Sequence, residues 1–277
     1  MSGLTAEAKA ALQALGVAPT KRRGQNFMVR AADLEAIAET AGIGPGDDVV
    51  EIGPGLGFLT RSLLSRGARV AVVEKDFVMT RHLRAAFPGL RVLEKDILKA
   101  DLSRDFGFEA PVTVVGNIPY NITSPILEWL IGQRRLLRAA YLTVQKEVGV
   151  RLAARPGGKE WGSLSAFVQY HAAVSVRRAI GRSSFYPPPK VDSALVELLF
   201  SGRPAVEVRN EPLFFSLIRR SFQKRRKTLL NALRSEGVPG ALTRERLLAA
   251  FQGCGLDPRR RPETLSLQEW AALADRL

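Results

Sequence analysis

The segment Asn117-Ile118-Pro119-Tyr120 combines residue types that could hold and activate an aromatic amine. Such an amine is a poor nucleophile because its lone pair is delocalised into the ring. Acceptors on its N–H bonds favour a more tetrahedral nitrogen, and the Asn117 side-chain oxygen and a main-chain carbonyl at Ile118 or Pro119 would supply them. Tyr120 would stack on the base, a contact worth about 1–3 kcal/mol. Catalysis would then consist of positioning and polarisation without a dedicated general base.

The same tetrapeptide is also a good turn between a strand and a helix, which is the purely structural alternative. Asn-Ile-Pro-Tyr nevertheless resembles the N-P-P-Y-type signature of enzymes that methylate the exocyclic amine of adenine. Its place at the end of an apolar run, Val112-Thr-Val-Val115, favours the functional interpretation.

A glycine-rich segment, Glu51-Ile-Gly-Pro-Gly-Leu-Gly57, forms a second candidate site. Glycines allow positive φ and leave no Cβ in the way of a ligand, here at Gly53 and Gly55. The dinucleotide fingerprint G-x-G-x-x-G is not met, because Phe58 stands at its third glycine. Glu74 ends the next apolar run, where a carboxylate suits the two hydroxyls of a ribose. The pattern looks like the motif of methyltransferases that use S-adenosylmethionine; another nucleotide site and a plain turn are the alternatives.

The elements that must position these residues alternate along the chain. We expect strands at 48–52, 69–74, 91–95, 112–115, 139–145, 172–180 and 193–200, with helices at 5–15, 31–41, 58–66, 76–86, 124–131, 146–154 and 163–171. This alternation indicates an α/β fold with a mostly parallel sheet and helices on both faces. The carboxyl ends of the strands would bring Gly53, Glu74, Asp96 and Asn117 to one rim.

The composition changes after Phe200. Residues 206–277 are expected to form helices only, near 211–222, 225–235, 243–252 and 266–276. We therefore predict two domains: 1–205, a Rossmann-like class I methyltransferase domain, and 206–277, a small all-α domain. Before the boundary, three prolines make 183–190 an extended, stiff loop. From that loop Phe185 is expected to form the wall opposite Tyr120 and enclose the base.

The charge balance favours a polyanionic partner. The 277 residues carry a formal net charge of +14 and have a pI of about 10.6, which points to nucleic acid. Coding bias or thermal adaptation is the alternative. In the basic C-terminal part we expect RNA phosphate contacts from five side chains on a helical segment: Arg219, Arg220, Lys224, Arg225 and Arg226. The alternative is a solvated helix face that does not bind RNA.

Other features exclude further classes of site. The single cysteine, Cys254, allows no internal disulfide, and His82 and His171 show no metal-ligand spacing, so we expect no metal. There is no apolar signal core and no run of membrane-spanning length. We expect a cytoplasmic protein with no membrane association, and a monomer, since nothing resembles a dimer seam.

Taken together, the motifs resemble one family, the KsgA (RsmA) type of small-subunit ribosomal RNA adenine dimethyltransferase. They are Gly24-Gln-Asn-Phe-Met28, the glycine segment, Glu74-Lys-Asp76, Asp96-Ile97, Asn117-Ile-Pro-Tyr120, Phe185-Tyr-Pro-Pro-Pro-Lys-Val-Asp-Ser193 and Phe222-Gln-Lys-Arg-Arg-Lys-Thr-Leu-Leu230. The resemblance implies N6,N6-dimethylation of two adjacent adenosines in a hairpin loop near the 3′ end of 16S rRNA, and a role in small-subunit assembly.

The resemblance also assigns the cofactor contacts residue by residue. Asn26 and the Met28 backbone would contact S-adenosylmethionine, whose amino-acid part would approach Gly53 and Gly55. Glu74 would take the ribose hydroxyls. Asp96 would accept from the adenine amine, with Ile97 beside that ring, and Asn117 would lie between the cofactor and the target base. Met28, Arg30 and Ile118 depart from the commoner Leu, Asp and Leu of the family.

Two rival functions remain at this point. The antibiotic-resistance dimethyltransferase of large-subunit rRNA shares the fold and can carry the same tetrapeptide. The glycine segment, the triple-proline segment and the tail Arg225-Arg-Lys-Thr-Leu229 favour the small-subunit enzyme. A ribosome-assembly factor that only binds RNA on the same fold is the other, and the intact set of cofactor positions argues against it. A DNA adenine methyltransferase fits less well, since no separate base-reading domain is visible.

Overall fold

The computed structural model describes residues 3–17, 26–234 and 243–277, which form two compact units. The first unit comprises Met1–Gly149 and Val174–Gly202, and the second comprises Val150–Ala173 and Arg203–Leu277. Gly24 and Gln25 of the first motif lie outside the described residues.

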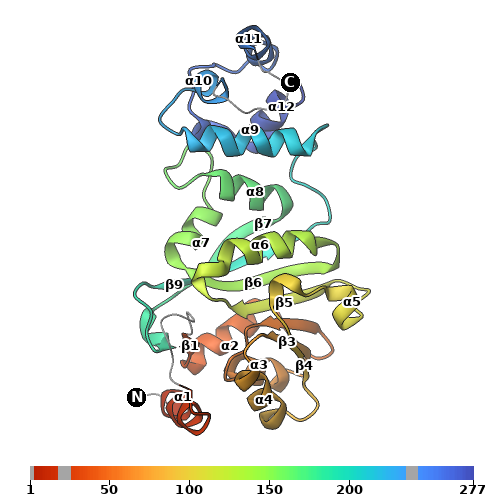
Figure 1. Ribbon diagram of the computed structural model, residues 1–277, viewed down its shortest axis with the longest axis vertical. Helices are drawn as coiled ribbons and strands as arrows, with labels where there is room; N and C mark the ends of the chain where they lie inside the picture. The colour runs from red at the N-terminus through yellow and green to blue at the C-terminus, as the bar shows by residue number, and fades with distance from the viewer. Residues whose placement is uncertain (1–2, 18–25, 235–242) are drawn as a thin grey trace. The chain divides into compact units, whose positions relative to one another are not determined.

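The first unit is built on a seven-stranded sheet of order β4-β3-β2-β5-β6-β9-β7 (Figure 1). The strands are β2 (Asp48–Ile52), β3 (Arg69–Glu74), β4 (Arg91–Glu94), β5 (Val112–Asn117), β6 (Leu137–Gln145), β7 (Ala173–Ile180) and β9 (Ser193–Leu199). The first five strands in this order run parallel, and β9 pairs antiparallel with β6. Apolar runs such as that of β5 are buried on both faces, as central parallel strands must be.

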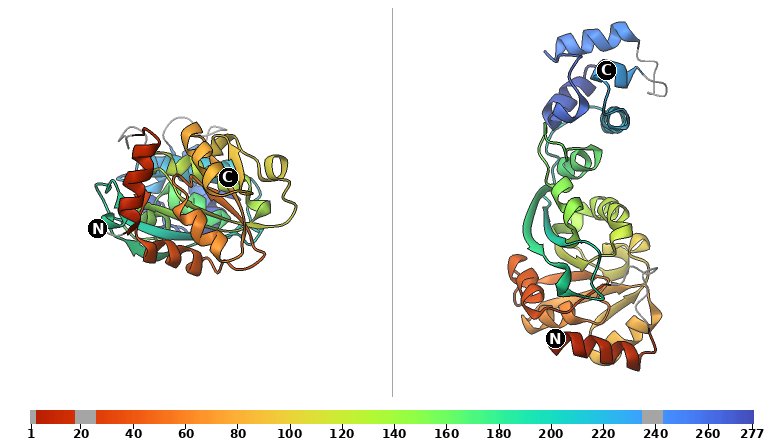
Figure 2. Two further views of the ribbon diagram at one scale, coloured as in Figure 1. Left: turned by 90° about the horizontal axis from the view of Figure 1, so that it is seen from below. Right: turned by 90° about the vertical axis from the view of Figure 1, so that its left-hand side faces the viewer.

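Helices cover both faces of this sheet. The helices of this unit are α1 (Gly3–Ala14), α2 (Ala31–Thr40), α3 (Phe58–Ser65), α4 (Phe77–Ala86), α5 (Leu102–Phe106) and α6 (Thr123–Gly132), and α7 (Lys146–Leu152) begins in it and ends in the second unit. Figure 2 shows α2 and α6 on opposite faces. The strand order reverses between β2 and β5, and such a switch point leaves a crevice outside the carboxyl ends of the strands.

A small second sheet lies beside this crevice. It pairs β1 (Phe27–Met28) antiparallel with β8 (Phe185–Tyr186), and the Val29 amide extends the pairing by donating to the Ser184 carbonyl at 2.8 Å. The Ser184 hydroxyl donates to the buried carboxylate of Asp33 at 2.6 Å. The chain before α2 is thus attached to a segment more than 150 residues away.

The second unit is entirely helical among its described residues. It contains α8 (Ser163–His171), α9 (Glu211–Gln223), α10 (Leu229–Leu233), α11 (Arg244–Gly253) and α12 (Leu267–Ala274) around a core that includes Trp161, Phe214 and Trp270. The Trp161 indole donates to the Leu265 carbonyl at 3.2 Å. Such contacts explain why residues 150–173 group with the C-terminal helices, whereas a single boundary near 205 would separate them.

One expected helix starts later in the structure. The sequence pattern predicted a helix over 225–235, but Lys224–Lys227 form a turn after α9, and α10 begins at Leu229. The Lys227 amide donates to the Lys224 carbonyl at 2.8 Å, which closes this turn. Thr228 then adopts an extended conformation and begins α10. The basic run therefore lies on a turn and not on a helix face.

Candidate active site

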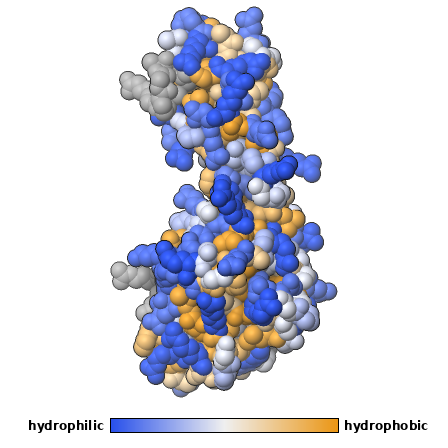
Figure 3. Space-filling view, turned by 90° about the vertical axis from the view of Figure 1, so that its right-hand side faces the viewer, coloured by the Kyte–Doolittle hydropathy of each residue, from blue (hydrophilic) through white to orange (hydrophobic). Residues whose placement is uncertain are grey.

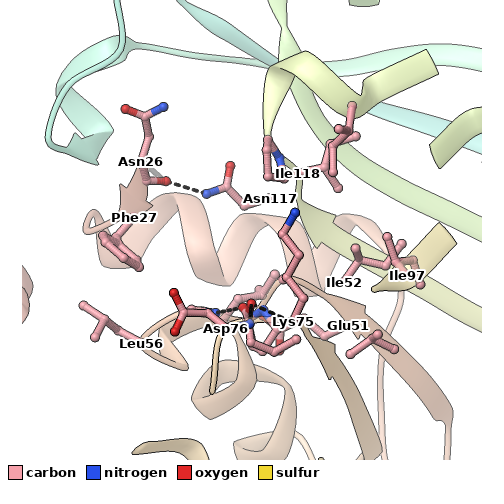
Figure 4. A pocket seen from close by; sticks show the side chains of 18 of the residues that line it. Asn26, Phe27, Glu51, Ile52, Leu56, Lys75, Asp76, Ile97, Asn117 and Ile118 are labelled. Carbon is pink, nitrogen blue, oxygen red and sulfur yellow. Dashed lines mark hydrogen bonds between the residues drawn. The ribbon is translucent and has the colours of Figure 1, made fainter. Parts of the chain in front are cut away.

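A cavity of about 680 Å³ opens at the crevice of the first unit. This volume is in the range of small-molecule sites. Ten of the residues expected to bind cofactor or base line it: Asn26, Met28, Gly53, Gly55, Glu74, Asp96, Ile97, Asn117, Pro119 and Tyr120. Figure 4 shows labelled side chains from the first segment, the glycine turn and β5 facing one space.

The glycine turn leaves room that a side chain would fill. Gly53 has φ +64°, and a Cβ added there would meet no atom within 4 Å, so it would project into open space. Gly55 has φ +56°, and its added Cβ would lie 2.8 Å from the Phe27 ring. Both residues therefore need glycine, Gly53 for its backbone conformation and the open space, and Gly55 also for the close approach of Phe27.

The Glu74 carboxylate is held by backbone amides at the end of β3. One of its oxygens accepts from the amides of Lys75 and Asp76, each at 2.9 Å, and the other lies 3.4 Å from the Gly55 amide. Burial raises the pKa of Glu74, and these hydrogen bonds oppose the rise. The carboxylate is thus oriented in the cavity wall, where it can accept further hydrogen bonds from ligand hydroxyls.

Asp96 and Ile97 supply a polar and an apolar surface at the next strand end. Asp96 begins a short 3₁₀ turn, and its side chain accepts from the Leu98 amide at 3.1 Å. Ile97 is only 6% exposed, so its side chain forms a fixed apolar wall. This pairing of an acceptor with an apolar wall suits the edge and the face of a purine.

Asn117 is oriented by the first segment of the chain. Its Nδ2 donates to the Asn26 carbonyl at 2.8 Å, as the dashed line in Figure 4 shows. Because the amide nitrogen is engaged there, the side-chain oxygen remains the acceptor for a ligand. Sequence reasoning missed this contact, which joins residues 91 positions apart and carries no local signal.

Tyr120 is hydrogen-bonded to a residue 73 positions further along the chain. Its hydroxyl lies 2.6 Å from the Ser193 hydroxyl at the start of β9. Burial raises the pKa of Tyr120, so the phenol stays neutral. The prediction that Phe185 forms the wall opposite Tyr120 is wrong. Phe185 is 3% exposed, pairs with Met28 in the small sheet and is not among the residues that line the cavity. Its aromatic side chain fills the core beneath the β1–β8 sheet.

Glu51 is a cavity residue to which the sequence assigned no role beyond the motif. It is 2% exposed, and the Thr60 hydroxyl donates to it at 2.6 Å. Burial raises the pKa of Glu51 to about 8, an effect that Thr60 opposes and Glu74 reinforces. The carboxyl is therefore mostly protonated at neutral pH.

The five side chains expected to contact RNA all lie in the second unit, but they differ in exposure and in hydrogen bonding. Arg219, Lys224 and Arg226 are exposed. Arg220 is partly buried and reaches Ser216 at 3.3 Å. Arg225 donates to the carbonyls of Lys159 and Trp161 and lies 4.0 Å from Glu263, so it holds loops of its own unit. Figure 3 shows hydrophilic side chains over much of one face of this unit, bordering smaller hydrophobic areas.

The described residues hold neither a metal-binding cluster nor a helix able to span a membrane. Within residues 3–17, 26–234 and 243–277, no group of three or more His, Cys, Asp or Glu side chains could hold a metal ion. Over the same residues, none of the helices has the length and apolar character needed to cross a membrane.

Comparisons with known proteins agree with the geometry. The family model described as ribosomal RNA adenine dimethylase matches residues 19–271. Ribosomal RNA small subunit methyltransferase A of Moorella thermoacetica is 43% identical over 270 residues, covering 94% of this chain and 92% of the relative. The protein of the same name from Geobacillus thermodenitrificans is 39% identical over 276 residues, covering 97% and 94%.

Two solved structures are also similar. A dimethyladenosine transferase from Plasmodium falciparum has a TM-score of 0.73 at 28% identity, covering 89% of this chain and 95% of that one. The 23S rRNA methyltransferase ErmE has a TM-score of 0.69 at 28% identity, covering 91% and 99%.

Proposed function

The chain belongs to the ribosomal RNA adenine dimethylase family, and from this premise we propose that it methylates the N6 amines of two adjacent adenosines near the 3′ end of 16S rRNA. It is an S-adenosylmethionine-dependent methyltransferase, and each target base becomes N6,N6-dimethyladenosine. The observation that carries the proposal is one cavity lined by both the cofactor residues and Asn117-Ile118-Pro119-Tyr120.

The choice of the small subunit rests on the relatives. Proteins named for the small subunit are about 40% identical over nearly the whole chain, whereas the 23S rRNA methyltransferase ErmE is 28% identical. The shared fold explains why the structure of ErmE is similar to this chain despite the lower identity. We therefore favour 16S rRNA over 23S rRNA as substrate.

The cavity fits the cofactor on three observations. Open space at Gly53 admits its amino-acid part, amide-held Glu74 can accept from the ribose hydroxyls, and Asp96 can accept from the adenine amine. Asn26, Met28, Gly55 and Ile97 complete the lining of this cavity. When bound, the cofactor supplies an electrophilic methyl group.

The protein residues then act on the base. The Asn117 side-chain oxygen and the Ile118 carbonyl accept from the two N–H bonds of the amine, which directs its lone pair toward the methyl group. Pro119 sets the chain direction, and its own carbonyl already accepts from the Ile122 amide at 3.2 Å. Tyr120 stacks on the ring. The amine nitrogen would take the methyl group from the sulfonium sulfur, which is left as a neutral thioether, and would then release a proton to water. A second transfer with a fresh cofactor would give the dimethylated base.

We propose that exposed cations of the second unit contact rRNA phosphates. Arg219, Lys224 and Arg226 remain candidates, with Arg220 as a partly buried neighbour, whereas Arg225 serves the unit's own structure. We also propose that the protein acts as a monomer and in the cytoplasm, where ribosomal subunits are assembled.

The test is methyl transfer from labelled S-adenosylmethionine to small subunits that lack the modification, with large subunits in parallel. N6,N6-dimethyladenosine in digests of the small-subunit RNA alone is the expected result. The same product in large-subunit RNA would move the protein to the ErmE-like activity. Tight subunit binding without transfer would make it a binding factor.

A further inference from the structure

We propose that Ser193 is a positioning residue for the target base, acting through the hydroxyl of Tyr120. The inference rests on the proposed function, because it takes Tyr120 as the ring on which the adenine stacks. It also gives the proline-rich segment a role different from the one expected of Phe185.

The Ser193 hydroxyl sits on a rigid frame. The residue is completely buried and begins β9, where it is paired with Gln145 of β6. The preceding residue is fixed on two sides: the Asp192 carbonyl accepts from the Lys146 amide, and its carboxylate accepts from the Arg182 amide, both at 3.0 Å. The hydroxyl therefore has a fixed position relative to the sheet.

Tyr120 needs such an anchor at the far end of its ring. Its backbone is held by the Thr123 hydroxyl, which donates to the Tyr120 carbonyl at 3.1 Å. Its two side-chain torsions would otherwise be free to select other rotamers, because the ring faces the cavity. A hydrogen bond of 2.6 Å between the phenol and Ser193 fixes both torsions at once. One face of the ring is then presented to a base without an ordering step on binding.

The sequence places this anchor at the end of the segment Phe185–Ser193. That segment starts with Phe185 in the core and finishes with Ser193 behind Tyr120. Its contribution to the base site is thus indirect: it delivers the hydroxyl that orients the aromatic ring.

The experiment compares Ser193→Ala, Tyr120→Phe and the double variant on small subunits that lack the modification. Each single variant should raise the KM for subunits by roughly 3- to 10-fold, the effect of one neutral hydrogen bond, and leave the Kd of the cofactor within twofold. The double variant should match the single ones, because both remove the same contact. Additive effects, or an unchanged KM in both single variants, would overturn the inference.

Thr143→Val is the matched control. Thr143 is also completely buried, lies on β6 opposite Leu195, and has a hydroxyl without a partner among the described residues. The KM of Thr143→Val for small subunits should stay at the wild-type value. This result would separate the loss of any buried hydroxyl from the loss of the hydrogen bond between Ser193 and Tyr120. If Ser193→Ala does not fold, Tyr120→Phe decides the question from the other side of the bond. Failure of the wild-type chain to methylate small subunits would reject the proposed function instead.

Discussion

At the scale of residues, two carboxyl groups of the cavity are held in different protonation environments. Burial raises the pKa of Glu74, but three backbone amides oppose the rise because they favour its charged form. Glu51 has a single hydroxyl donor and is buried, so its neutral form is favoured and its pKa rises to about 8. The two carboxyls, on adjacent strands, can thus serve different purposes. Glu74 can accept hydrogen bonds from a ligand, whereas Glu51 packs in the cavity wall.

Replacing Glu51 with Gln should change how stability depends on pH. Between about pH 4.5 and pH 8 the unfolded wild-type chain ionises this carboxyl while the folded protein keeps its proton. The free energy of unfolding therefore falls as pH rises through this window and levels off above it. Glu51→Gln cannot ionise, so it should gain on the order of 4 kcal/mol over wild type at pH 8.5 and less than about 1 kcal/mol at pH 5. Urea unfolding at both pH values measures this, and parallel pH profiles for the two proteins would refute it.

At the scale of elements, the turn between β2 and α3 determines what the cavity can admit. Gly53, Gly55 and Gly57 all have positive φ, and Gly57 begins α3. Added side chains at Gly55 and Gly57 would collide with Phe27 and Phe87, whereas one at Gly53 would enter open space. All three positions favour glycine for their positive φ; Gly55 and Gly57 also need it for packing, and we expect a bound ligand to add a further requirement at Gly53.

Gly53→Ala should separate cofactor binding from stability. A residue with a Cβ at φ +64° costs about 1 kcal/mol or more of stability, and this Cβ would occupy the cofactor's space. Cofactor affinity should fall at least tenfold by calorimetry. Gly46→Ala is the matched control, since Gly46 has φ +82° and open surroundings but does not line the cavity. Equal affinity losses in both variants would show that backbone strain, and not the ligand, explains the glycine.

Local patterns predicted most elements to within a few residues. The strand ends at Gly53, Glu74, Asp96 and Asn117 do meet at one rim, because the carboxyl ends of parallel strands share an edge. Patterns could not show the pairing of β1 with β8, in which each strand has only two residues. They also missed the five-residue α5, which Asp101 caps and Gly107 ends. The burial of Phe185 and the contacts Asn117–Asn26 and Tyr120–Ser193 depend on tertiary packing alone.

At the scale of the whole molecule, the excess of positive charge is only partly available for RNA. The chain carries +14, and residues 206–277 contribute +6 of it. Within that segment Arg225, Arg259 and Arg260 pair with Glu263, Asp257 and Glu269. Exposed cations such as Arg219, Lys224 and Arg226 are better placed to replace counterions on a phosphate backbone.

Two adjacent arginines allow a direct comparison. Arg226→Ala should weaken binding to small subunits and reduce the slope of log K against log salt by about 1, with an unchanged melting temperature. Arg225→Ala should mainly lower the melting temperature, because it removes the hydrogen bonds to the Lys159 and Trp161 carbonyls. Salt titrations and thermal unfolding of both variants measure this. A loss of slope in Arg225→Ala alone would reverse the assignment.

We infer that Asn117, oriented by the Asn26 carbonyl, polarises the target amine. The most direct measurement is single-turnover methylation of small subunits by Asn117→Ala at saturating cofactor, with nucleoside analysis of the product. We predict a loss of at least about 100-fold in rate, as for removal of one hydrogen-bonding group that stabilises a transition state, with subunit binding retained. A rate of N6,N6-dimethyladenosine formation near that of the wild type would rule out this role for Asn117.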